Sequence, residues 1–152
     1  MVNITLHRPT EPDLAYITRN MRAPDRAECI ASGANPETAV FTGNALSTHS
    51  VCARVDGEPA CVFGLVPISI MNGVGCPWLL GTDLVYLHGR ALIRGTRNYI
   101  PEMLRAYPHV LNHVHVRNEI AVRWLRHIGF ELHPAKEYGP YGELFHLFEM
   151  RA

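Results

Sequence analysis

Apolar and polar residues alternate most regularly near the C-terminal end of the chain, and this stretch predicts its clearest pair of elements. Residues 110–116 alternate in this way and are rich in valine, a pattern typical of a β-strand. Asn118 is a residue type that favours the start of a helix, and apolar residues recur at helical spacing as far as Ile128. Gly129 is typical of a helix end and Phe130 of the apolar residue beyond it. The pattern predicts a strand, a sharp turn, a short amphipathic helix and a return into another strand.

The remaining strands are predicted from the same alternation of apolar and polar residues, and the remaining helices from the same helical spacing. Further strands are expected at residues 3–9, 50–55, 60–70, 74–80, 131–134 and 144–150. Further helices are expected at residues 10–21, 26–31, 35–46 and 89–106, and a connecting loop at residues 82–88. Pro101 should kink the last of these helices or mark a boundary in it. Gly75 and Pro77 interrupt the alternation of residues 74–80, which indicates a bulge or a splayed edge. The order of elements predicts a mixed α+β sheet covered by helices.

The four cysteines show no spacing typical of a metal site. The two-residue turn Asp56-Gly57 would place Cys52 directly opposite Cys61 on neighbouring strands. A cross-strand disulfide is one interpretation, and two buried thiols in a reduced, cytoplasmic chain is the favoured one.

Composition narrows the class of protein. The chain has 152 residues, 47% hydrophobic and 18% charged, which predicts a single globular domain over residues 1–152. A formal net charge of zero argues against a nucleic-acid binder that depends on phosphate contacts. No apolar run is long enough to span a bilayer, and the first ten residues do not have the pattern of a secretion signal.

The stretch around residues 110–130 resembles the C-terminal half of the GNAT acyltransferase superfamily. The family pattern is a strand, then Asn-x-x-Ala, then seven residues, then Gly-Phe, and here those positions are Asn118, Ala121, Gly129 and Phe130. The resemblance implies a GNAT-like fold, with a mixed and mostly antiparallel central sheet flanked by helices. It also implies that the fourth and fifth strands part, and that acetyl-CoA binds in the gap.

A second resemblance covers most of the chain. The segments at residues 77–83, 94–97 and 123–125 look like a family of small tailed-phage proteins described as GNAT-like or as internal virion proteins. This resemblance implies a viral protein in the host cytoplasm, or one associated with the virion. A host or virion protein would then be a partner. It implies neither a nucleic-acid partner nor membrane association, and the oligomeric state stays open.

The GNAT resemblance also implies where the pyrophosphate of acetyl-CoA would bind. The family marks that site with Arg/Gln-x-x-Gly-x-Gly/Ala at a helix start, where free N–H groups favour an anion. Residues 84–92 correspond to it, but Leu84 and Leu87 replace the first basic or amide residue and the first glycine, and only Gly89 is kept. The cofactor-binding residues expected from the resemblance are Leu80, Gly81, Gly89, Arg90 and Asn118.

Each of these residues also has an interpretation that needs no cofactor. Gly89 would be a glycine at a helix start, and Asn118 would only cap its helix. Arg90, together with Arg94 and Arg97, would form a solvated basic face.

The catalytic residues are less well marked. Many GNAT enzymes have a tyrosine seven residues after the asparagine that protonates the leaving thiolate, and here that position is Leu125. Tyr138, or Tyr141 beside it, is the substitute that the sequence offers. Asp83 is the carboxylate nearest the end of the fourth strand and is the expected general base; alternatively it only caps a turn. His113 and His115 share a strand face, but no partner is spaced to complete a metal site, so no metal is expected.

Two functions from different classes remain open. The first is a phage-encoded N-acetyltransferase in which an amine attacks acetyl-CoA directly, with backbone N–H groups near Leu80 and Gly81 stabilising the oxyanion. The second is a catalytically silent GNAT-fold protein that binds a host or virion protein. The missing tyrosine and the changed glycine loop favour the second function, and the spacing around Asn118 favours the first.

Overall fold

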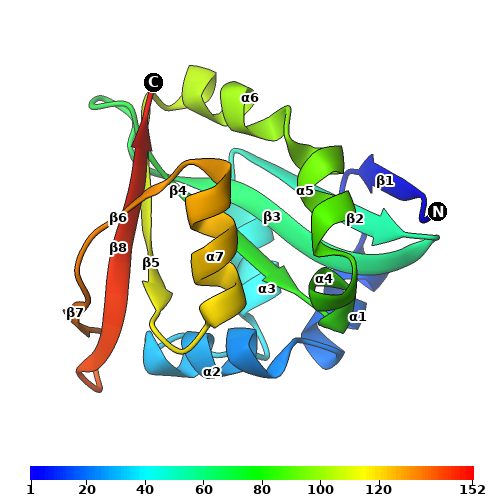
Figure 1. Cartoon of the computed structure of the whole chain (residues 1–152), viewed down its shortest axis with the longest axis horizontal. Helices are drawn as coiled ribbons and strands as arrows, with labels where there is room; N and C mark the ends of the chain where they lie inside the picture. Colours follow the sequence, from blue (N-terminus) through cyan, green and yellow to red (C-terminus); the bar gives the residue numbers. More distant parts are fainter.

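A computed structural model describes residues 1–152 as one mixed sheet with helices on both faces (Figure 1). The strands are β1 (Ile4–His7), β2 (His49–Val55), β3 (Glu58–Ser69), β4 (Val74–Gly81), β5 (His109–His115), β6 (Glu131–Leu132), β7 (Lys136–Tyr138) and β8 (Glu143–Arg151). The helices are α1 (Glu11–Arg19), α2 (Ala23–Ala31), α3 (Ala39–Leu46), α4 (Asp83–Leu87), α5 (Gly89–Thr96), α6 (Tyr99–Ala106) and α7 (Glu119–Ile128).

The sheet has the order β1-β2-β3-β4-β5-β8-β6, and β7 also pairs with β8. Every pair is antiparallel except β4 with β5, which is parallel. The α+β class and the mixed, mostly antiparallel sheet expected from the sequence are therefore confirmed. None of the helices combines the length and the apolar character needed to cross a membrane.

Alternation along β2 and β3 divides the core between the two faces of the sheet. Cys52 and Val62 pack with the apolar residues of α1, α2 and α3. Their neighbours Cys61 and Phe63 point the other way, toward α4, α5 and Trp124 of α7. A third cluster joins α6 and α7 to β5 and β8. The helices before β2 thus cover one face and the helices after β4 the other.

The β2–β3 hairpin corrects one expectation. Asp56-Gly57 does form the turn, and Val55 pairs with Glu58, but a bulge between Ala53 and Arg54 shifts the register by one residue. Cys61 therefore lies opposite Ala53, not Cys52, and all four cysteines are free thiols. Since successive residues of a strand face opposite sides, this shift puts the two thiols on different faces of the sheet.

The segment after β4 corrects two further expectations. Residues 82–88 are not a loop, because Thr82 caps the short helix α4 by accepting a hydrogen bond from Leu84 N–H over 3.3 Å. Residues 89–106 are two helices rather than one. The break falls at Arg97 and Asn98, and Pro101 lies in the first turn of α6, where a proline needs no intrahelical partner.

Candidate functional site

Strands β4 and β5 part soon after they meet. Their register contains only two pairs, Val74 with His109 and Gly75 with Val110. The next residue of β4 with its backbone facing β5 is Pro77, which has no N–H group to extend a ladder. The two strands then diverge from their shared end, as Figure 1 shows. The expected gap between the fourth and fifth strands is confirmed.

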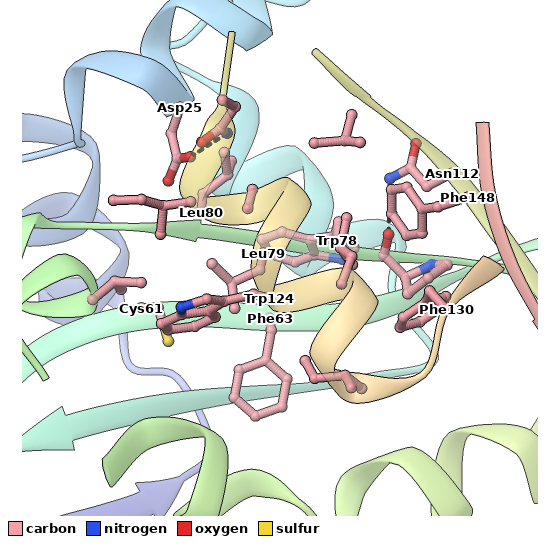
Figure 2. A pocket seen from close by; sticks show the side chains of 18 of the residues that line it. Asp25, Cys61, Phe63, Trp78, Leu79, Leu80, Asn112, Trp124, Phe130 and Phe148 are labelled. Atoms are coloured by element: carbon pink, nitrogen blue, oxygen red, sulfur yellow. Dashed lines mark hydrogen bonds between the residues drawn. The ribbon is translucent and has the colours of Figure 1, made fainter. Parts of the chain in front are cut away.

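The gap is part of a cavity of about 730 Å³ that runs between the diverging strands and under α7. Figure 2 shows Asp25 at one end of this cavity and Asn112 toward the other, with Leu79 and Leu80 of β4 between them. The lining is mostly hydrophobic, as in pockets that bind small molecules. Leu87 is 68% exposed and does not line the cavity, so this leucine leaves the slot open.

A buried polar network closes the α2 end of the slot. Arg22 donates a hydrogen bond from Nη2 to the side-chain oxygen of Asn118 over 2.8 Å and lies 3.4 Å from the Asp25 carboxylate. The amide of Asn118 donates to Asp25 over 3.2 Å and, at 3.5 Å, to Glu28. Asn118 sits at the start of α7, yet its side chain makes no capping hydrogen bond. Its role is to tie α7 to α2, which corrects the interpretation that it only caps its helix.

The same two carboxylates also hold the diverging ends of both strands. Asp25 accepts a hydrogen bond from Gly81 N–H at the end of β4, over 3.0 Å. Glu28 accepts one from His115 N–H at the end of β5. These bonds satisfy backbone groups that the parted strands cannot offer to each other. The network therefore fixes the width of the slot at this end.

Burial gives Glu28 acid–base properties suited to catalysis near neutral pH. Desolvation raises the pKa of its carboxyl to about 7, and the charge of Asp25 adds to this, while the His115 N–H hydrogen bond opposes it. Burial also raises the pKa of Asp25, against the opposing effect of Arg22. Glu28 is among the residues that line the cavity. A perturbed carboxyl in a cleft is a typical general base.

Backbone N–H groups of alternate β4 residues face the slot. Thr82 N–H donates to the carbonyl oxygen of Ala60 on β3 over 2.8 Å. This bond shows which residues of β4 direct their backbone groups toward β3 and which direct them toward β5. Leu80 therefore points its N–H toward β3, while Leu79 and Gly81 point theirs toward β5. Because Gly81 N–H already donates to Asp25, Leu79 carries the amide that remains for a ligand in this part of β4. The sequence led us to expect Leu80 and Gly81 here. Leu80 lines the slot, but its N–H group points toward β3. Gly81 lies at the end of β4, and its N–H group donates to Asp25.

The two residues expected to be catalytic lie in different places. Asp83 begins α4, is exposed and does not line the cavity. Tyr138 does line it, from strand β7, a strand that the sequence pattern did not indicate. Its ring stacks on His113 of β5 with the ring centres 3.8 Å apart. Leu125, the residue at the tyrosine position of the family, also lines the cavity.

His113 and His115 of β5 each contact another side chain of the protein. His115 lies 2.8 Å from the Glu143 carboxylate through its Nε2 atom. His113 is half-buried against Tyr138, and this burial lowers its pKa. Both residues thus support the wall of the slot that β5 and β8 form.

Gly89 and Arg90 lie at the start of α5 and do not themselves line the slot. A Cβ atom added at Gly89 would lie 2.7 Å from the indole ring of Trp124, so the ring would have to shift to admit any side chain here. Arg90 is exposed, as a solvated basic face requires. A short helix and an indole therefore lie where the family has a glycine-rich loop.

We expect Gly89→Ala to destabilise the protein by about 1–3 kcal/mol, because the added methyl group overlaps the ring of Trp124. Thermal unfolding measures the loss, and the double variant Gly89→Ala/Trp124→Leu should recover a large part of it. An unchanged melting temperature for Gly89→Ala would contradict the packing explanation.

Sequence reasoning missed Arg22, Asp25 and Glu28. One signal was present: Asp25 lies four residues before the buried Cys29, so helical spacing places this carboxylate on the inner face of α2. Glu28 lies three residues after Asp25 and so shares its helix face, but its backbone partner His115 is 87 residues away and no spacing indicated that contact.

Comparisons with known proteins agree with this architecture. No family model matches the sequence, and no curated protein matches it. Among solved structures, spermidine N-acetyltransferase from Vibrio cholerae, in complex with CoA and spermine, matches with a TM-score of 0.69 at 15% identity; the match covers 97% of this chain and 95% of that one. The ribosomal-protein-S18-alanine N-acetyltransferase from Escherichia coli matches with a TM-score of 0.65 at 14% identity, over 99% and 94% of the two chains. A GCN5-related N-acetyltransferase from Kribbella flavida matches with a TM-score of 0.66 at 14% identity, over 98% of both chains. This chain therefore has the fold of the GNAT acetyltransferases.

Proposed function

We propose that this protein is an N-acyltransferase that binds acetyl-CoA in the β4–β5 slot and passes the acetyl group to an amine. One observation carries the proposal: an open slot between parted strands is lined both by Glu28, whose carboxyl is buried, and by Leu79, whose backbone amide faces the slot. Solved structures of the same fold are described as acetyltransferases, one of them in complex with CoA and an amine.

The slot suits the chemistry of the substrate. Its volume of about 730 Å³ lies within the range usual for small-molecule sites. An extended chain with amide groups would find apolar walls and, on β4, a backbone amide that no other strand uses. The residues present therefore fit the pantetheine arm of acetyl-CoA. The nucleotide end has no comparable cradle, since α4 replaces the glycine-rich loop.

The chain's own residues supply two of the groups that acyl transfer needs. Glu28 accepts a proton from the incoming ammonium group, which leaves a neutral amine to attack the thioester carbonyl. Leu79 N–H donates to the carbonyl oxygen as negative charge develops on it. The new C–N bond forms as the C–S bond breaks, and the second proton that the attacking nitrogen loses passes to the departing thiolate, either directly or by relay through Tyr138 or a water molecule. Holding both substrates in the slot supplies much of the remaining rate enhancement.

Isothermal titration with acetyl-CoA tests the proposal, combined with an assay that detects the free thiol of CoA in the presence of small primary amines. We expect saturable heat with a dissociation constant in the micromolar range and thiol release that requires the amine. No heat at millimolar acetyl-CoA would end the acyltransferase proposal.

A second function deserves the same experiment: a catalytically silent GNAT-fold protein that acts by binding a host or virion protein. Two observations favour it, the leucine at position 125 and the helix α4 in place of the pyrophosphate loop. A protein that folds normally but neither binds acetyl-CoA nor releases CoA would favour this second function over the first. The phage resemblance, and with it the host cytoplasm or the virion as location, stays a prediction.

A further inference from the structure

The side chain of Asn112 bridges the slot just beyond the point where β4 and β5 part. Its Nδ2 atom donates a hydrogen bond to the carbonyl oxygen of Pro77 on β4, over 2.8 Å. Its Oδ1 atom accepts one from the backbone N–H of His113 on β5, over 2.7 Å. One carboxamide group therefore satisfies a backbone acceptor on one wall of the slot and a backbone donor on the other.

These two backbone groups are the ones that a continuous parallel ladder would join directly. The register that pairs Gly75 with Val110 would next set Pro77 beside Asn112, and His113 N–H would then donate to the Pro77 carbonyl. The missing N–H of Pro77 ends that ladder, and the strands separate beyond it. The Asn112 carboxamide fills this space with one donor and one acceptor, as the peptide group of an inserted strand would.

We propose that Asn112 is an internal substitute for an amide of the pantetheine chain, and that an incoming acyl-CoA displaces the carboxamide and takes over its two hydrogen bonds. This inference rests on the acyltransferase function proposed above. It makes Asn112 a specificity-determining residue. A ligand compensates for the displaced bonds only if it carries an N–H and a C=O group at this level of the slot.

The surroundings allow this exchange. Asn112 is half-buried and lines the cavity (Figure 2), so its carboxamide borders open space. Phe130 and Phe148 flank this end of the cavity and are apolar, so they offer the carboxamide no competing hydrogen bond. In the free protein the bridge to Pro77 and His113 is thus the arrangement that satisfies the most polar groups.

Titration of Asn112→Ala with acetyl-CoA and, separately, with pantetheine tests the inference. We expect both ligands to bind about tenfold tighter than they bind the wild type, since no internal bridge has to be broken; this corresponds to ~1.4 kcal/mol. An equal gain for pantetheine, which lacks the nucleotide, would locate the effect in the slot. Asn72→Ala is the matched control, because Asn72 is exposed in the β3–β4 turn and its side chain makes no hydrogen bond.

Asn112→Ser keeps a polar group too short to reach Pro77 and serves if the alanine variant folds poorly. A ligand that binds the wild type but binds these variants equally or more weakly would overturn the inference and leave the acyltransferase function intact. Binding by the variants alone would support both. If neither the wild type nor the variants bind at millimolar ligand, the proposed function fails and this inference fails with it.

The free protein offers a readout that needs no ligand. Amide hydrogen exchange at His113 should be slowed by the Asn112 bridge and should become at least tenfold faster in Asn112→Ala, while exchange in the β2–β3 hairpin stays unchanged. Equal exchange at His113 in both proteins would show that no bridge forms in solution, and would also overturn the inference.

Discussion

Glu28→Gln is expected to lower kcat/KM for acetyl transfer by about 100-fold or more, because general base catalysis contributes roughly that much. Glutamine keeps the size of the side chain and can still accept the His115 N–H hydrogen bond. It cannot take the proton of the attacking amine. The measurement is steady-state thiol release with acetyl-CoA and a primary amine.

The pH profile distinguishes a base from a residue that only supports the slot. The wild type should gain activity as the pH rises through about 7, the pKa to which burial raises Glu28. Glu28→Gln should lose this dependence. Glu37→Gln is the matched control, a surface glutamate whose only ion pair is with Arg26. A Glu28→Gln enzyme within threefold of the wild type, with the same pH profile, would exclude Glu28 as the base.

The same substitution should change how stability depends on pH. A carboxyl whose pKa is higher in the folded state favours folding at low pH, and this contribution is lost as the pH rises from about 4.5 through about 7. For the wild type the loss attributable to Glu28 is about 3 kcal/mol at most. Unfolding in urea at pH 5 and pH 8 should therefore show a smaller difference for Glu28→Gln than for the wild type.

Arg22→Met is expected to destabilise the protein by about 3–5 kcal/mol at pH 8. Removing one partner of a buried ion pair leaves an uncompensated charge, and here Asp25 and Glu28 would both lose their nearest cation. Methionine preserves most of the apolar stem, so the loss reports mainly on charge and hydrogen bonding. Thermal unfolding should show a fall of about 10 °C.

Arg26→Met is a demanding control, because Arg26 also pairs with a glutamate, over 2.7 Å, but on the surface. Exposed pairs contribute about 0–1 kcal/mol. The loss in Arg22→Met should be smaller at pH 5, where the buried carboxyls take up protons. It should also be partly recovered in Arg22→Met/Asp25→Asn, which removes both charges. Equal losses for the two arginines would contradict a structural role of the buried network.

Most strands and helices could be predicted from local patterns in the sequence. The alternation of residues 110–116, the apolar period that ends at Gly129 and the interruption at Pro77 correspond to β5, α7 and the parting of β4 from β5. Each signal involves neighbours along the chain, where backbone geometry and side-chain period suffice. The predicted turn at Asp56-Gly57 was also correct. The predicted strand register was wrong, because a bulge at Ala53 inserts one extra residue that the local turn pattern does not indicate.

The chemistry of the site depended on contacts between distant segments. Asn118 was identified from its spacing, but its partners Arg22 and Asp25 lie more than 90 residues away. The pKa of Glu28 depends on how deeply the folded chain buries it, a property that no spacing encodes. The sequence by itself determined most of the strands and helices and the place where the sheet opens. Only the tertiary structure decided which carboxyl faces the opening and which backbone amides remain free there, because both follow from the packing of α2 against the ends of β4 and β5.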